Sequence, residues 1–316
     1  MKAKIILGLF LFFDLTLAGY LYAYEEKADK IPTFNPLIMG GSTKSICEAA
    51  ATTTKNNISN SDIFAGMSEK IKTHLNDGTE YSVYIAYPQK SATPYIYNSK
   101  PLRSASMIKI FILAATMEAD KTGQLSIDEV MTLKSSDKVG GAGILAGYAT
   151  GSRLSMKEVL RLMITESDNT ATNMIIDRVG MSTINAYIKK HGYKDTELKR
   201  KMMDTEAVRA GRENMSSVVD LGEIFRKIYY STCVSPTHDK IMLEFLKGQT
   251  DMDCFPSALP DAVIAHKTGA LIGLYDDGGI IYRNGYDTIL VIMTENYTGE
   301  RNAINHMKAF AKTVAL

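Results

Sequence analysis

The chain has few of the residues from which metal sites and disulfide scaffolds are built. Its 316 residues include three cysteines, five histidines and no tryptophan. Three cysteines are too few for a disulfide-built scaffold, and no two of them form a CxxC pair. The histidines are scattered and form no HExxH motif. We therefore expect no metal ion and no other cofactor.

An excess of charge of one sign is also lacking. The 36 Lys and Arg residues oppose 35 Asp and Glu residues, for a formal net charge of +1. A near-neutral chain has no basic field, so we expect no nucleic-acid partner. The 45% hydrophobic and 22% charged residues are typical of a globular protein. The length allows one large domain or two smaller ones.

An apolar run lies near the N-terminus, over residues 5–24, after Lys2 and Lys4. A charged start followed by a short apolar stretch is typical of an export signal. A retained membrane anchor is the alternative, although Asp14 would cost about 3 kcal/mol near the centre of a span. We predict that residues 1–24 are a signal peptide or anchor and provide the only membrane contact. The protein would then be periplasmic or extracellular.

Residues 25–60 contain Pro, Gly and Asn without a sustained period, and we predict a linker there. After it, strand patterns occur at both ends of the chain: 81–87, 94–97, 262–266, 279–283 and 286–294. Helical signals dominate between them and return at 300–314. We expect an α+β fold, with the strands in one antiparallel sheet flanked by helices and the helical middle as an inserted lobe.

Three local signals predict helix starts in the helical middle. Ser126…Glu129 and Ser155…Glu158 match the capping box, in which side chains bond free backbone N–H groups. Ser235-Pro236 would open another helix, with proline in its first turn.

An S-x-x-K motif, Ser106-Met107-Ile108-Lys109, precedes the apolar helical run 110–115. At a helix start, Ser106 and Lys109 lie one turn apart on one face. A lysine whose pKa is lowered by burial or nearby charge can take the serine proton. The motif alone is weak, because Ser135–Lys138 has the same spacing in a polar stretch.

Two further motifs follow, Ser167-Asp168-Asn169 after an apolar stretch and Lys267-Thr268-Gly269 at the end of a strand-like run. Alone, the first is explained by a helix cap and the second by a strand end. S-x-x-K, S-D-N and K-T-G in this order are the signature set of class A β-lactamases and penicillin-binding proteins. From about residue 61 to 316 the sequence therefore resembles the class A β-lactamase family, especially its β-lactamase-like serine hydrolase branch.

The resemblance implies four catalytic residues. Ser106 would be the nucleophile that attacks a lactam carbonyl, and Lys109 would activate it. Ser167 would relay a proton to the departing lactam nitrogen, and Lys267 would supply positive charge beside it.

The resemblance also implies substrate-binding residues. Asn169 would hydrogen-bond the side-chain amide of the substrate, and Thr268 would bind its carboxylate. Gly269 and Ala270 would line the site, and the backbone N–H groups of Ala270 and Ser106 would hold the oxyanion.

One departure from the family concerns deacylation. Efficient class A enzymes carry a Glu, in an E-x-x-x-N pattern after S-D-N, that activates the deacylating water. Here a loop arginine, Arg200, is present, but Met202 or Met203 stands where Glu is expected. Asp204 and Glu206 are the remaining candidate bases, although neither has the required pattern around it.

A second departure follows K-T-G, where many members have an arginine for the substrate carboxylate. Asp276-Asp277-Gly278-Gly279 occupies this region, and two acids there could repel an anionic substrate. Arg283 is near in sequence but cannot be assigned a place.

The predicted catalytic domain spans residues 61–316, with a sheet lobe at about 61–103 and 259–316 and a helical lobe at about 104–258. We expect a monomeric serine hydrolase that forms an acyl-enzyme on Ser106 with β-lactams and deacylates slowly. The alternatives are a penicillin-binding D,D-peptidase-like enzyme acting on peptidoglycan peptides, which the missing Glu favours, and a non-catalytic envelope binding protein.

Cys233 and Cys254 both lie in this domain. Export would permit a disulfide between them, closing a loop of about 20 residues. Two buried free thiols are equally expected.

Overall fold

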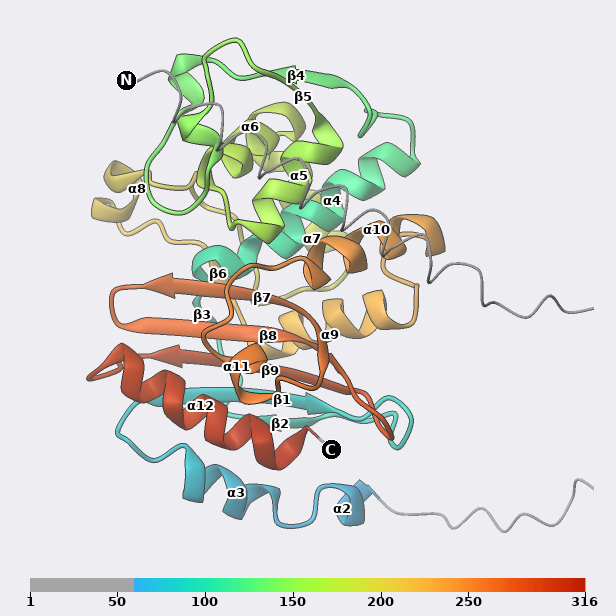
Figure 1. The fold of residues 1–316 in the computed structure, drawn as a ribbon, viewed down its shortest axis with the longest axis vertical. Coiled ribbons are helices and arrows are strands. Elements are labelled where there is room, and N and C mark those ends of the chain that lie inside the picture. Colours follow the sequence, from blue (N-terminus) through green and yellow to red (C-terminus); the bar gives the residue numbers. More distant parts are fainter. Residues whose placement is uncertain (1–59, 316) are drawn as a thin grey trace, which may run out of the picture. The chain divides into compact units, whose positions relative to one another are not determined.

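Five strands form one antiparallel sheet, in the order β2-β1-β9-β8-β7 (Figure 1). The computed structural model describes residues 60–315. The predicted export segment, Cys47 and nearly all of the predicted linker lie outside these residues. The strands are β1 (Glu80–Ala86), β2 (Tyr95–Tyr97), β7 (Val263–Leu271), β8 (Leu274–Tyr282) and β9 (Thr288–Glu295). Because β1 pairs with β9 over its whole length, the two ends of the described chain meet in one sheet, as predicted.

Helices cover both faces of the sheet. On one face lie α3 (Met67–His74), α11 (Phe255–Ala258) and α12 (Glu300–Val314), which share an apolar cluster with the strands. On the other face α9 (Val218–Tyr229) contacts β1, β8 and β9. The alternation of side chains along each strand thus supplies two cores, one on each face. The α+β prediction is confirmed.

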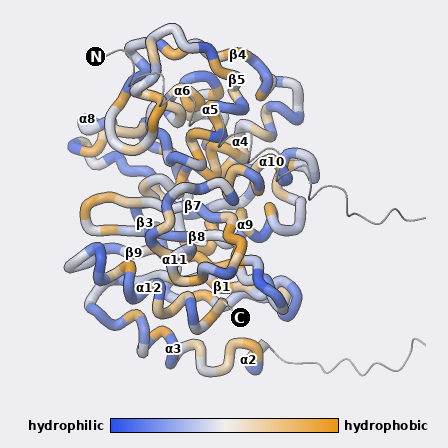
Figure 2. Tube along the Cα trace, in the orientation of Figure 1, coloured by the Kyte–Doolittle hydropathy of each residue, from blue (hydrophilic) through white to orange (hydrophobic). Residues whose placement is uncertain are grey.

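The helical lobe is built around α4 (Lys109–Lys121), whose residues 110–115 are all buried. A helix that is apolar all round must lie inside the protein, and Figure 2 shows apolar colour in this region. Around it lie α5 (Met156–Thr165), α6 (Asn169–Val179), α7 (Met181–Lys190) and α10 (Pro236–Lys247). The smaller elements are α2 (Asn60–Ile63), α8 (Thr205–Arg209), β3 (Leu102–Arg103), β4 (Val130–Thr132), β5 (Arg153–Ser155), β6 (Met215–Ser216) and the 3₁₀ turns η1 (Ala105–Ile108), η2 (Ser135–Asp137) and η3 (Leu145–Gly147).

Two of the three predicted helix starts are confirmed. The Ser155 hydroxyl accepts a hydrogen bond from the Glu158 N–H at the start of α5, and Ser235 caps α10 with Pro236 in its first turn. The prediction at Ser126 is wrong, because residues 126–129 form a turn that leads into β4. Pairing of β4 with β5 decides the conformation there, against the local capping pattern.

Strands β7 and β8 are longer than their sequence patterns predict. K-T-G lies inside β7, and Asp276 to Gly279 lie inside β8. The glycines permit close packing, since a Cβ atom on Gly278 would lie 3.0 Å from the Met107 methyl carbon and one on Gly279 2.4 Å from the Ala265 carbonyl oxygen.

Cys233 and Cys254 are buried free thiols. They belong to different apolar clusters on opposite faces of the sheet, so the disulfide alternative is wrong. Within residues 60–315, no helix is long and apolar enough to cross a bilayer.

A tight contact joins α9 to the sheet and predicts a stability effect. A Cβ atom on Gly222 would lie 2.4 Å from the Tyr84 ring, whose hydroxyl bonds Glu223 at 2.8 Å. We expect Gly222→Ala to lower the free energy of urea unfolding by about 1–3 kcal/mol through overpacking. Gly147→Ala is the control, because Gly147 has open space around its Cα. Equal effects of the two substitutions would contradict this packing.

Candidate active site

Ser106 lies in η1, directly before α4, and packs beside the edge strand β7. The preceding residue, Ala105, has a φ of 42°, in the left-handed region that L-residues rarely adopt. Gly269 of β7 makes the approach possible, since a Cβ atom there would lie 3.1 Å from the Ser104 carbonyl oxygen and 3.2 Å from the Ala105 methyl group. The close contact therefore places Ser106 next to K-T-G.

Lys109 is completely buried at the start of α4. Its ammonium group donates hydrogen bonds to the Ser167 carbonyl oxygen at 2.5 Å, the Ser167 hydroxyl at 3.2 Å and the Asn169 side-chain oxygen at 3.0 Å. Burial, and then the positive charge of Lys267, hold the pKa of Lys109 well below its usual value. A lysine that is readily neutral and has acceptors for an added proton is suited to act as a base.

Lys267 approaches the same serine from the sheet. It is completely buried, and its Nζ donates to the Ser167 hydroxyl at 3.0 Å and to the Thr268 carbonyl oxygen at 2.8 Å. Burial lowers the pKa of Lys267 to about 7, although Asp251 and Asp277 act in the opposite direction. The structure therefore brings Lys109, Ser167, Asn169 and Lys267 together from three separate segments.

The S-D-N loop between α5 and α6 is held by its aspartate. Ser167 has a φ of 51°, and the Asp168 carboxylate accepts hydrogen bonds from the backbone N–H groups of Ile144 at 2.7 Å, Leu145 at 2.6 Å and Ala171 at 2.9 Å. The bond from Ala171 caps α6, and the other two tie the loop to residues 144–145. Asp168 thus positions its neighbours rather than facing the site.

A glycine-rich wall beside Asn169 was not identified from the sequence. The Asn169 amide donates to the Gly140 carbonyl oxygen at 3.2 Å. A Cβ atom on Gly141 would lie 2.6 Å from the Asn169 amide nitrogen, and one on Gly143 2.3 Å from the Asp168 carboxyl carbon. Both glycines have positive φ, so the Gly-Gly-Ala-Gly run was the available signal for this wall.

The Ser106 hydroxyl has no hydrogen-bond partner among the residues that the structure describes. Lys109 is bonded to Ser167 and Asn169 instead, although it lies on the next turn. Catalytic hydrogen bonds are often formed only when substrate is present. Thr268 is buried and Ala270 is exposed on the same strand, at the edge where β7 has no further neighbour.

The loop that should supply the deacylating base has methionines, Met202 and Met203, where the Glu is expected. The Asn173 side chain, one turn after Asn169 on α6, bonds both backbone groups of Met202, accepting from its N–H at 2.8 Å and donating to its oxygen at 3.0 Å. The Met202 side chain belongs to the helical core. Met203 has a φ of 62° and is half exposed, with its sulfur beside Gly141. Arg200 is buried and paired with Glu213.

The two candidate bases on this loop, the carboxylates of Asp204 and Glu206, do not bond the catalytic residues. Asp204 accepts a hydrogen bond from the Ala207 N–H at 2.9 Å and so caps α8. Glu206 is exposed in the first turn of that helix. Neither is bonded to Ser106, Lys109 or Ser167.

The two aspartates after K-T-G do not face a substrate, so the expected repulsion is wrong. Both are completely buried in β8. Asp277 accepts from the His266 ring at 2.9 Å and from the Phe255 N–H at 3.0 Å. Asp276 accepts from the Thr294 N–H, and burial raises its pKa well above the usual value, which favours the neutral acid. Arg283 bonds the Ala315 carbonyl oxygen, at the end of β8 away from K-T-G.

The buried state of Lys267 predicts a pH-dependent stability. Its pKa falls from 10.5 in the unfolded chain to about 7, so between these values the unfolded state binds more protons and stability rises with pH. We expect wild-type protein to gain on the order of 4 kcal/mol relative to Lys267→Met between pH 7 and pH 10 in urea unfolding. Lys157→Met, at an exposed lysine, should show no such trend. A pH-independent difference for Lys267→Met would contradict the assignment.

Comparison with solved structures agrees with this fold. The β-lactamase from Sphaerobacter thermophilus superimposes with a TM-score of 0.72 at 24% identity, over 79% of this chain and 95% of that one. PBP-A superimposes with a TM-score of 0.71 at 25% identity, over 78% and 93%. A PBP-A variant with leucine replaced by glutamate, solved as an acyl-enzyme complex with penicillin G, matches equally well.

Sequence comparison leads to the same family. The β-lactamase of Streptomyces fradiae is 25% identical over 217 residues, which cover 66% of this chain and 71% of the relative. The sequence profile of the beta-lactamase enzyme family matches residues 66–315. With the S-x-x-K, S-D-N and K-T-G residues gathered at one edge of the sheet, this match shows that the chain belongs to the β-lactamase family, as a class A β-lactamase-like serine hydrolase.

Proposed function

We propose that Ser106 opens β-lactam rings by forming an acyl-enzyme. The observation that supports this most strongly is the convergence of Lys109 and Lys267, two completely buried lysines, on the Ser167 hydroxyl. Burying a cation costs free energy, so burial lowers the pKa of both lysines and makes the neutral amine accessible. A protein that only bound its ligand would need neither a nucleophile nor a base. The non-catalytic alternative is therefore disfavoured.

We propose the following acylation step. Neutral Lys109 takes the proton from Ser106 while the serine oxygen attacks the lactam carbonyl carbon. The negative charge that develops on the carbonyl oxygen is held by the backbone N–H groups of Ser106 and Ala270. The C–N bond then breaks, and the lactam nitrogen takes the proton of the Ser167 hydroxyl, which regains one from Lys109. An ester on Ser106 and a free amine result.

We propose that deacylation is slow because the water-activating carboxylate is missing. Met202 stands where the family's Glu is expected, and its backbone is bonded to Asn173, one turn from Asn169. Asp204 caps α8, and the Glu206 side chain is exposed to solvent. The acyl-enzyme complex of the PBP-A variant shows that penicillin G can acylate a protein of this fold.

A D,D-peptidase-like activity on peptidoglycan peptides is the second candidate. Its support is the apolar Met202 at the position of the missing Glu, whereas the family match is to β-lactamases.

We also propose that residues 1–24 direct the enzyme out of the cytoplasm, because of their charged start and apolar run. Either substrate would be met there.

The kinetics of acylation test the proposed mechanism. We expect a chromogenic cephalosporin to give a burst equal to one product per protein, followed by slow turnover. Intact-protein mass spectrometry should find one adduct, on Ser106. Ser106→Ala should abolish both signals, whereas Ser135→Ala, in the second S-x-x-K sequence, should leave them unchanged. Absence of both the burst and an adduct in wild-type protein would refute acylation.

Restoring a carboxylate tests the account of deacylation. We expect Met202→Glu to raise the deacylation rate at least about tenfold, because its backbone is pinned beside the site and a glutamate could activate water. Val208→Glu is the control, since it adds a carboxylate to the same loop at an exposed position on α8. The measurement is loss of the mass adduct with time. A folded Met202→Glu protein with an unchanged rate would contradict the proposal.

A further inference from the structure

A cavity lies at the start of the K-T-G strand, on the side of β7 that His266 faces. It has a volume of about 510 Å³ and opens between the end of α10, the segment that leads from α11 to β7, and the first residues of β7. Its lining includes Lys247, Met252, Leu259, Val263 and His266. The volume is within the range of about 300–1,000 Å³ that is typical of small-molecule sites.

His266 forms the polar part of the cavity wall. It is 2% exposed, and its Nδ1 bonds the buried Asp277 carboxylate at 2.9 Å. Its other ring nitrogen, Nε2, has no partner among residues 60–315. A buried imidazole that is fixed on one side by a carboxylate and unpartnered on the other is prepared to bond a ligand.

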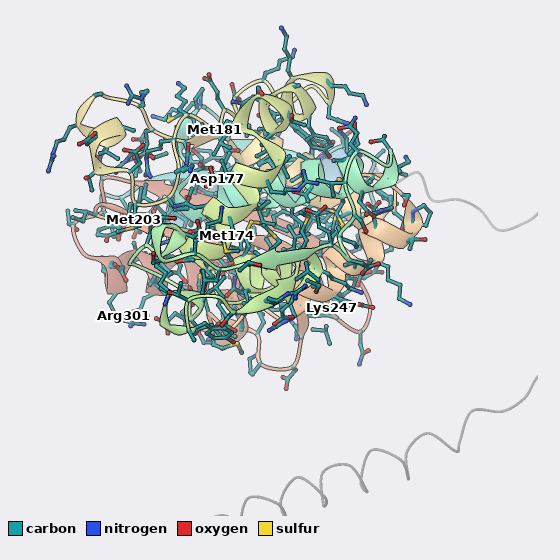
Figure 3. All side chains as sticks on the ribbon, turned by 90° about the horizontal axis from the view of Figure 1, so that it is seen from above. Met174, Asp177, Met181, Met203, Lys247 and Arg301 are labelled. Carbon is teal, nitrogen blue, oxygen red and sulfur yellow. The ribbon has the colours of Figure 1, made fainter. Side chains whose placement is uncertain are left out.

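The cavity is separate from the catalytic site. Successive side chains of a strand point to opposite faces, so His266 and Lys267 face away from each other. Lys267 contacts Ser167, whereas the partner of His266, Asp277, accepts from the α11 residue Phe255. Figure 3 also shows Lys247 and Met203, which belong to the two sites, on opposite sides of the molecule.

Lys247 supplies a positive charge at the rim of this cavity. The Lys247 ammonium lies 4.9 Å from the centre of the Tyr282 ring and is otherwise exposed. The Gln249 amide is already used, since it donates to the Ile164 carbonyl oxygen and accepts from the Asp251 N–H. None of the described residues that line the cavity is acidic.

The remaining surface is apolar and partly open to solvent. Met252 is 59% exposed and Val263 56% exposed, beside Leu259, Pro260 and Ile264. Contiguous exposed apolar side chains around a concavity often mark a ligand-binding groove. The chemistry therefore fits a molecule with an apolar body and one anionic end.

We propose that this cavity binds a small amphipathic carboxylate. Its apolar chain lies against Met252, Leu259 and Val263, and its carboxylate pairs with Lys247. This site goes beyond the β-lactamase reaction and does not depend on it.

Calorimetric titration of the full-length protein with octanoate tests the proposal. We expect saturable binding at one site, with octanol, the neutral molecule of equal chain length, at least about tenfold weaker because it lacks the charge. Two substitutions at the exposed rim should preserve the fold. Lys247→Ala should weaken octanoate binding about fivefold by removing a cation, and Val263→Asp by more through repulsion.

Lys240→Ala is the matched control, because Lys240 is exposed on the same helix but does not line the cavity. It should leave the affinity unchanged. The proposal is overturned if octanoate does not bind saturably, if octanol binds equally well, or if either rim substitution leaves the affinity for octanoate unchanged. Because binding is measured directly, these outcomes are independent of whether Ser106 is acylated.

Discussion

The Ser167 hydroxyl accepts hydrogen bonds from two buried lysines, and the rest of the site is arranged around this contact. Lys109 comes from the first turn of α4 and Lys267 from strand β7. Each is desolvated, and the charge of Lys267 further disfavours a proton on Lys109. Since an amine that resists protonation is a usable base, the packing of the helical lobe against the sheet is itself part of the proposed chemistry.

Keeping these groups in place requires backbone conformations that are unfavourable by themselves. Ala105, Ser167 and Met203 all have positive φ although none is glycine. Such residues cost about 1–3 kcal/mol each and persist where surrounding contacts over-determine them. Here the contacts are the Asp168 carboxylate with its three backbone donors, the close approach of Gly269 to η1, and the Asn173 clamp on Met202.

Part of this arrangement could be predicted from the sequence. The order of strand and helix patterns predicted the sheet with an inserted helical lobe. The three motifs predicted the residues that meet at Ser167, because each motif carries its own chemistry. The helix at Ser126 and the repulsion by Asp276 and Asp277 were wrong, because strand pairing and burial are tertiary properties. The wall at Gly140 to Gly143 was missed, since its glycines have meaning only beside Asn169 and Asp168.

The central claim is that Ser106 is the nucleophile of an incomplete hydrolytic cycle. A crystal structure of the protein soaked with penicillin G tests it most directly. The account predicts an ester between the Ser106 hydroxyl oxygen and the opened lactam carbonyl, with the carbonyl oxygen between the backbone N–H groups of Ser106 and Ala270. Penicillin bonded to another residue, or bound intact with Ser106 unmodified, would contradict it.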